Sequence, residues 1–142
     1  MDFAQDERTR EFCGRLESFM DSHIYPAEPV YAEQAAKAAQ AGDPWHRPPV
    51  VAELKAAARE RGLWNLFLPG HSGGAGLTNL QYAPLAETTG RSAALAPEAL
   101  NCAAPDTGNM EVLAEFGSAE QQARTAAMPR SAFPTSVCRP RT

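Results

Sequence analysis

Apolar residues recur at helical spacing in successive segments of this sequence, and proline or glycine closes each segment. The first stripe falls at i, i+4, i+7, i+8, i+11 and i+12, one face of a 3.6-residue period: Phe12, Leu16, Phe19, Met20, His23 and Ile24. Pro26 is expected to end this helix, because proline disfavours the helical conformation at the residue before it. No segment alternates apolar and polar residues as a half-buried strand does, so the sequence predicts an all-α domain.

Further helices follow from proline starts, glycine stops and capping patterns. They are expected at 28–41, from Pro48 and Pro49 to Gly62, from Thr78 onward, at 98–103, and from Asp106 or Thr107 to Gly117. Gly62 suits a left-handed C-terminal cap. Thr78 with Gln81 and Ser118 with Gln121 have the spacing of capping boxes. Pro84 lies inside the helix that begins at Thr78 and is expected to bend it.

Two features between the third and fourth helices leave the local structure open. Residues 63–68 hold a dense apolar cluster, which fits either a buried strand or a tight turn packed beneath helices. The stretch PGHSGGAGLT follows at 69–78. Its glycines favour a tight turn, because glycine adopts positive φ without steric cost. The charged residues of the preceding helix are predicted to form a solvated face: Glu53, Lys55, Arg59, Glu60 and Arg61.

The glycine stretch also fits the G-x-S-x-G pattern of a serine nucleophile, with Ser72 at its centre. Such a site needs a hydrophobic strand before the serine and a helix directly after it. Pro69 and the following glycines suit neither. The general-base histidine of such hydrolases follows the serine in the chain, whereas His23, His46 and His71 all precede it. A serine hydrolase using Ser72 is therefore kept only as an alternative.

Composition restricts the class of protein further. The chain has 142 residues, enough for one compact domain, and 44% of them are apolar. The sequence contains no apolar run of about 18 residues, so no membrane span is predicted. The acidic N-terminus is unlike a secretory or transit peptide, so a cytoplasmic location is expected. Cysteines 13, 102 and 138 are far apart and are expected to be reduced thiols.

Charge and pattern change together near the end of the chain. The first 123 residues carry 9 basic and 17 acidic groups, whereas the last 19 carry four arginines and no acid. Residues 124–142 contain three prolines and no helical period, so an irregular tail is expected. A basic tail can bind nucleic acid. This one has no lysine and only Phe133 as a stacking group, so no nucleic-acid partner is predicted.

The order of the motifs resembles the N-terminal helical domain of the acyl-CoA dehydrogenases over residues 3–123. The matching elements are G-L-W-x-L-x-L-P, then P-G-H-S-G-G-A-G-L-T, a capped helix with Glu87 before Gly90-Arg91, and F-G-x-x-x-Q-Q ending at Gln122. The segment A-P-D-T-G-N-M at 104–110 is similar to the branch that contains family members ten and eleven.

The resemblance implies an FAD-dependent oxidoreductase of fatty acid β-oxidation. In this family a glutamate removes the α proton of an acyl-CoA thioester, hydride passes to the flavin, and electrons pass to an electron-transfer flavoprotein. The family's T-E-P motif and the region of its base are absent here. We therefore expect an N-terminal domain at 1–123, an irregular tail at 124–142 that is frameshifted or disordered, and a truncated chain that is inactive alone.

The same resemblance implies a small set of site residues. Helices of this family's N-terminal domain form one wall of the acyl-chain cavity, which makes four residues candidates for substrate binding: Asn101, Asp106, Asn109 and Met110. Alternatively, Asp106 caps a helix and Met110 fills core. No catalytic, flavin-binding or metal residue is predicted. A different class of function, a non-catalytic helical module that binds a partner or self-associates through an uncovered apolar face, stays open.

Overall fold

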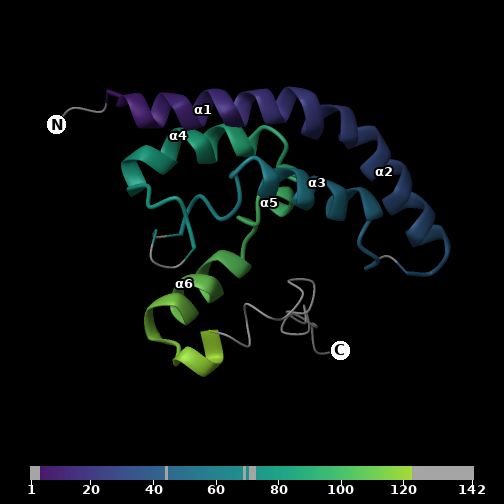
Figure 1. Ribbon diagram of the computed structural model, residues 1–142. Coiled ribbons are helices and arrows are strands. Elements are labelled where there is room, and N and C mark those ends of the chain that lie inside the picture. Colours follow the sequence, from purple (N-terminus) through teal and green to yellow (C-terminus); the bar gives the residue numbers. More distant parts are fainter. Residues whose placement is uncertain (1–3, 44, 69, 71–72, 123–142) are drawn as a thin grey trace. The chain divides into compact units, whose positions relative to one another are not determined.

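The computed structural model describes residues 4–43, 45–68, 70 and 73–122, and within these ranges it contains helices and no strands (Figure 1). Six helical elements belong to a first unit, Met1–Ala103: α1 (Glu7–Phe19), the π-helix η1 (Met20–Ile24), α2 (Tyr25–Gln40), α3 (Pro49–Glu60), α4 (Asn79–Gly90) and α5 (Ala96–Ala99). A second unit, Ala104–Thr142, contains α6 (Asp106–Phe116). The all-α prediction is confirmed.

The first two predicted helices form one continuous helical run, so the expectation that Pro26 ends the first helix is wrong. The run continues because η1 inserts a wider turn, in which the Tyr25 N–H donates to the Met20 carbonyl. Tyr25 keeps helical dihedrals, φ −60° and ψ −41°, although a proline follows it. Pro26 then follows as the second residue of α2, inside the continuous run.

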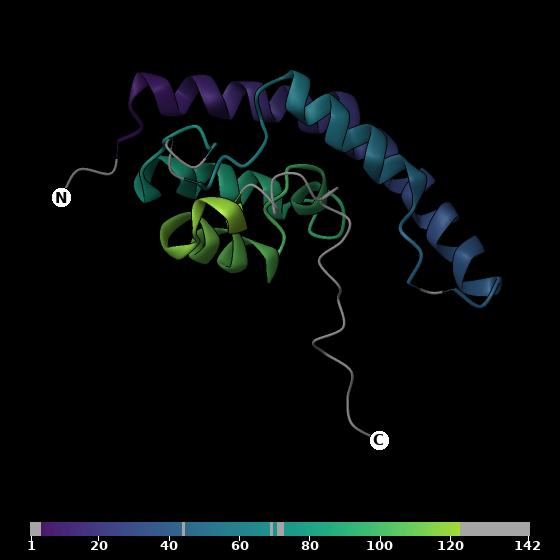
Figure 2. The same cartoon turned by 60° about the horizontal axis from the view of Figure 1, so that its bottom comes forward.

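The core of the first unit lies where α1 and η1 pack over the later helices. Figure 1 shows α1 running along α4, and Figures 1 and 2 both show α2 beside α3. α3 also contacts α5. The largest fully buried side chains come from α1, η1, α4 and two of the connections: Leu16, Phe19, Met20, Ile24, Leu63, Leu85 and Leu95. Among the described residues, no helix is long and apolar enough to span a membrane.

Lys55 and Glu98 join α3 to α5. The Lys55 ammonium lies 3.0 Å from the Glu98 carboxylate and the Lys55 side chain is only 13% exposed, which makes its predicted place on a solvated face wrong. Arg47 approaches the same carboxylate at 3.8 Å. The predicted helix at 98–103 is also wrong in extent. α5 spans only Ala96–Ala99, and Asn101 takes a left-handed φ of +59°, which is incompatible with a continuing helix.

The apolar cluster at 63–68 is a turn in the structure, not a strand. Leu63 and Leu68 are buried, and the N–H of Leu68 donates to the Asn65 carbonyl at 3.0 Å. In the glycine stretch, Gly73 and Gly76 have φ of +82° and +66°. A Cβ on Gly74 would lie 1.8 Å from the Leu68 carbonyl oxygen. The described glycines thus support the prediction of a tight turn, whereas Pro69, His71 and Ser72 lie outside the described residues.

α4 begins as predicted. The N–H of Gln81 donates to the Thr78 hydroxyl at 3.2 Å, and the N–H of Thr78 donates to the Gln81 side-chain oxygen at 2.9 Å, so the capping box is confirmed. The helix includes Pro84 in its interior. Pro84 leaves the Leu80 carbonyl without its helical donor, and because Leu80 is 52% exposed, water can reach that end of the helix.

The second unit contains a tight connection after α6. The N–H of Ser118 donates to the Gln121 side chain at 2.7 Å and the N–H of Gln121 donates to the Ser118 hydroxyl at 3.2 Å, which confirms the second capping box. The Gln122 amide donates to the carbonyls of Leu113, Ala114 and Gly117 at 3.1–3.3 Å. These bonds add a side-chain donor at the end of α6, where the Leu113 carbonyl also accepts the Gly117 N–H at 3.0 Å. The predicted irregular tail, 124–142, lies outside the described residues.

Candidate functional site

Asn101, the first of the candidate site residues, is part of a buried amide pair at the end of α5. Its side-chain N–H₂ donates to the side-chain oxygen of Asn65 at 2.6 Å. The backbone N–H of Asn65 donates to the Leu100 carbonyl at 3.2 Å. Asn65 is 2% exposed and Asn101 9%. The pair gives Asn101 a structural task, which favours packing over direct contact with a ligand.

Both members of this pair have left-handed backbones, with φ of +57° at Asn65 and +59° at Asn101. Among non-glycine residues, asparagine tolerates this conformation best, because its short polar side chain forms local hydrogen bonds. Left-handed backbone outside glycine is uncommon, and conformations that cost energy cluster at functional sites. Two such residues in direct contact mark this point as one where the chain path is tightly specified.

The residue after Asn101, Cys102, contacts a tyrosine on α4. Tyr82 on α4 hydrogen-bonds through its side chain to Cys102, the residue after Asn101. Burial raises the pKa of the Tyr82 phenol well above its ordinary value. Burial also raises the pKa of the Cys102 thiol, so this cysteine is held as a neutral thiol and is not an activated nucleophile. Cys13 and Cys102 are free thiols.

The other three candidates lie on α6 in the second unit. Asp106, Asn109 and Met110 are spaced i, i+3 and i+4, so they share one face of this helix. Asp106 is the first residue of α6 and Pro105 is its N-cap, where no side chain makes a capping hydrogen bond. Asp106 therefore favours α6 through the charge at its first turn and is not the N-cap. Asn109 is exposed, and Asp106 and Met110 are half-buried.

The described histidines make contacts that suit packing and surface roles. The ring of His23 stacks on Phe19 with centroids 4.9 Å apart, and its Nδ1 lies 2.6 Å from the Ser22 hydroxyl. Burial lowers the pKa of His23. His46 lies 3.5 Å from Asp43 on the surface. Among the residues that the structure describes, no three His, Cys, Asp or Glu side chains gather as metal ligands would.

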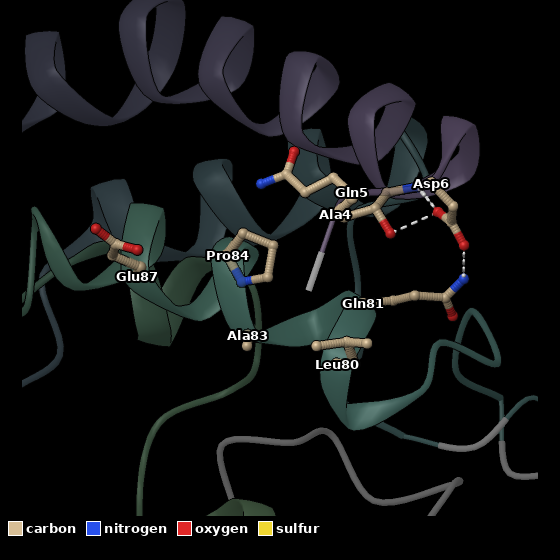
Figure 3. Close-up of a pocket in the computed structure, with 9 residues that line it drawn as sticks. Ala4, Gln5, Asp6, Leu80, Gln81, Ala83, Pro84 and Glu87 are labelled. Carbon is tan, nitrogen blue, oxygen red and sulfur yellow. Dashed lines mark hydrogen bonds between the residues drawn. The ribbon is translucent and has the colours of Figure 1, made fainter. Parts of the chain in front are cut away.

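A pocket of about 320 Å³ lies between the start of α1 and α4 (Figure 3). Asp6 crosses its rim: one carboxylate oxygen accepts from the N–H and hydroxyl of Thr9, both at 2.7 Å, and the other accepts from the Gln81 amide at 2.7 Å. These hydrogen bonds lower the pKa of Asp6 to about 2. Sequence reasoning missed this link. The Asp6-x-x-Thr9 spacing ahead of the first stripe was the available signal for an N-cap.

The pocket between α1 and α4 does not suit a flavin. The pocket is open and carries the carboxylates of Asp6 and Glu87, which would repel the pyrophosphate of FAD. The glycine turn offers no cradle either, because the Leu68 carbonyl occupies the space beside Gly74.

Comparisons with known proteins agree on one assignment. Residues 6–128 match the family model described as the acyl-CoA dehydrogenase N-terminal domain. The chain is 52% identical over 124 residues to the probable acyl-CoA dehydrogenase FadE2 of Mycobacterium tuberculosis, which covers 87% of this chain and 29% of that protein. It is 46% identical to acyl-CoA dehydrogenase family member 11 of Mus musculus, over 84% of this chain and 15% of that one.

A solved structure agrees with this assignment. A Mycobacterium abscessus protein assigned to the acyl-CoA dehydrogenases superposes with a TM-score of 0.75 at 44% sequence identity. The match covers 84% of this chain and 30% of that chain. The present chain thus spans less than a third of the length of each of these relatives.

Proposed function

The chain belongs to the acyl-CoA dehydrogenase family, and on that premise we propose that it is the N-terminal helical part of a flavin-dependent acyl-CoA dehydrogenase. The reaction proposed for the whole enzyme is removal of two hydrogens from the α and β carbons of an acyl-CoA thioester. FAD is its proposed cofactor, and an electron-transfer flavoprotein is its proposed electron acceptor. The observation that carries this proposal is the match of residues 6–128 to the family's N-terminal domain, on a chain whose described residues are helical.

We further propose that residues 1–142 alone neither retain FAD nor catalyse the reaction. Catalysis by this family needs a base and a flavin held together in one pocket. The described pocket and glycine turn do not suit a flavin. The chain also corresponds to only 29% of the FadE2 relative. The division into a helical domain at 1–123 and an irregular tail at 124–142 remains part of this proposal.

The proposed contribution of this chain is one wall of the acyl site. α6 presents Asp106, Asn109 and Met110 on a common face. A methionine suits an acyl chain because its unbranched side chain adapts to irregular apolar surfaces. Asn101 completes the candidate set, although its amide is bonded to Asn65. We therefore assign direct substrate contact to α6 and a supporting role to Asn101.

A chimera tests the proposed function directly. The region of FadE2 that aligns with residues 6–122 would be replaced by those residues of this chain, and the purified chimera compared with unaltered FadE2. The chimera is expected to retain FAD and to reduce an electron-accepting dye only when acyl-CoA is added. Met110→Ala in the chimera should change the preference among acyl chain lengths at unchanged flavin content. A matched exposed change, Gln40→Ala, should leave that preference unaltered.

The outcomes separate the possibilities. A folded chimera without flavin or without acyl-CoA-dependent dye reduction would contradict the proposal, provided that unaltered FadE2 shows both. A chimera that is active but insensitive to Met110→Ala would place the acyl wall elsewhere. Labelling of the 142-residue chain by a fluorophosphonate would support the serine hydrolase alternative.

One observation favours a second role for the chain on its own. α6 exposes Val112 and Phe116, 58% and 81% accessible, at i and i+4 on one face. An exposed apolar stripe of this kind promotes association. We propose that two copies associate through it. Sedimentation analysis should show a concentration-dependent dimer that Phe116→Ser abolishes, whereas Leu80→Ser, an exposed apolar residue on α4, should not; a monomer at all concentrations would refute this role.

A further inference from the structure

The Asn65–Asn101 pair lies where the first unit ends, which gives it a task beyond packing. Asn101 is followed by only two residues before the boundary at Ala103. Beyond that boundary the chain continues into Asp106, Asn109 and Met110. Asn101 is therefore among the last residues through which the chain leaves the first unit.

Asn65 makes contacts that control this conformation. Its side-chain oxygen accepts from the Asn101 amide at 2.6 Å, and its backbone N–H donates to the Leu100 carbonyl at 3.2 Å. Its own carbonyl accepts from Leu68, which ties it into the turn at 63–68. Both side chains are buried, so a change at Asn65 removes a hydrogen-bond acceptor from the buried Asn101 side chain.

We propose that Asn65 is a positioning residue: acting through Asn101, it fixes the point from which the chain leaves the first unit and enters the residues proposed to line the acyl site. This inference rests on the proposed function for the meaning of that site. In this proposal Asn65 contacts neither the substrate nor the flavin. Asparagine suits both positions because each combines a left-handed backbone with a side chain that bonds the other, Asn65 as acceptor and Asn101 as donor.

Amide hydrogen exchange in the full 142-residue chain tests the proposal. The local reporters are the N–H of Asn101, which donates to the Glu98 carbonyl at 3.3 Å, and that of Cys102, which donates to the Pro97 carbonyl at 2.8 Å. Asn65→Gly accepts the positive φ and removes only the side-chain amide. Exchange at both reporters should accelerate about tenfold or more, because the buried Asn101 side chain loses its hydrogen bond to Asn65, while amides of α1 keep their rates. The resonances of Asp106 to Met110 should shift.

Two further variants make the result specific. Asn65→Asp keeps an oxygen acceptor and tolerates the left-handed backbone, so it should restore most of the protection. Asn101→Gly should reproduce the effect of Asn65→Gly, and the double variant should add nothing to it. Asn79→Gly, at the exposed start of α4, is the matched control.

Other outcomes would overturn the proposal. Unchanged exchange at Asn101 and Cys102 would show that Asn65 does not control this point. Equal acceleration in α1, unshifted resonances at 106–110, or failure of both glycine variants to fold would make the pair a determinant of folding only. The experiment needs neither flavin nor acyl-CoA. Its failure would therefore leave the proposed function standing, and a failed chimera would leave the exchange result intact.

Discussion

Replacing Gly74 by alanine should destabilise this protein more than any other single-methyl addition at its glycines in the first unit. A Cβ at this position would lie 1.8 Å from the Leu68 carbonyl oxygen, 2.4 Å from the Leu68 carbonyl carbon and 2.8 Å from its Cβ. Real Cβ contacts do not fall below 3.0 Å, so the oxygen must move by about 1.2 Å. Backbone has to move, because no flexible side chain can make room.

The size of the effect follows from what must shift. Leu68 is 4% exposed and its turn packs beneath the helices, so displacement of its backbone disturbs buried contacts. Overpacking of a buried site costs about 1–3 kcal/mol and sometimes more. The obstacle here is backbone, which cannot rotate away as a side chain can. We therefore expect a loss of about 3 kcal/mol or more in the free energy of unfolding. That is a large share of the roughly 5–15 kcal/mol that stabilises a typical domain.

Urea unfolding followed by tryptophan fluorescence measures this loss. Trp64 is half-buried beneath the Arg59 guanidinium at 3.9 Å, whereas Trp45 is 89% exposed, so the change on unfolding reports mainly on Trp64 beside the turn. Gly73→Ala is one matched control. It meets no atom within 4 Å but has φ of +82°, so it should cost about 1–2 kcal/mol. Gly14→Ala, inside α1 with open space around it, should stabilise by about 0.5–1 kcal/mol.

The order of the unfolding free energies of the three variants tests whether Gly74 closely approaches the Leu68 backbone. If Gly74→Ala unfolds within 0.5 kcal/mol of the wild type, roughly the scatter of neutral surface changes, the close approach to Leu68 does not exist in solution. If it is no worse than Gly73→Ala, backbone contact with Leu68 does not explain the need for glycine at position 74.

Three other predictions concern side-chain links in the first unit. Asp6→Asn should reduce the pH dependence of stability. In the wild type the lowered Asp6 pKa contributes stability that is complete above the ordinary pKa of 3.8 and is lost as the pH falls through about 2. Urea midpoints measured across that range should therefore fall in the wild type and fall less in the variant. Lys55→Ala should cost about 1–3 kcal/mol of unfolding free energy, because it leaves the half-buried Glu98 carboxylate without its nearest cation. Lys37→Ala removes one partner of an exposed pair with Glu33 and should cost less than about 0.5 kcal/mol. Equal losses in urea unfolding would contradict the assigned burial of Lys55. His23 should titrate below its ordinary pKa of 6.5 in an NMR pH series, because burial disfavours the charged ring, and stability should therefore fall as the pH drops below 6.5; a raised pKa would refute the packed position on Phe19.

Local chemistry made much of the fold predictable from sequence. The capping boxes at Thr78 and Ser118 were readable because each depends on two residues at a fixed spacing. Gly62 has the predicted left-handed backbone, with φ of +63°. The failures came where one local rule met another. Proline signalled an end at Pro26, but a π turn reset the hydrogen-bond pattern before it.

The candidate site was predictable only in part. A common face for Asp106, Asn109 and Met110 follows from helical spacing alone. The pairing of Asn101 with Asn65 joins residues 36 positions apart, and no local pattern announces it. The same holds for the Asp6–Gln81 bond, which spans 75 positions. Ser72, the residue that first suggested a hydrolase, lies outside the described residues and gains no support from the histidines that are described.

Retention of FAD by the intact 142-residue chain tests the central claim most directly. The purified chain would be mixed with excess FAD, passed through a desalting column, and its flavin absorbance compared with its protein content, with FadE2 treated in parallel as the reference. The account predicts flavin on FadE2 and none on this chain, with no dye reduction when acyl-CoA is added. One flavin per chain, or acyl-CoA-dependent dye reduction by the chain alone, would contradict it.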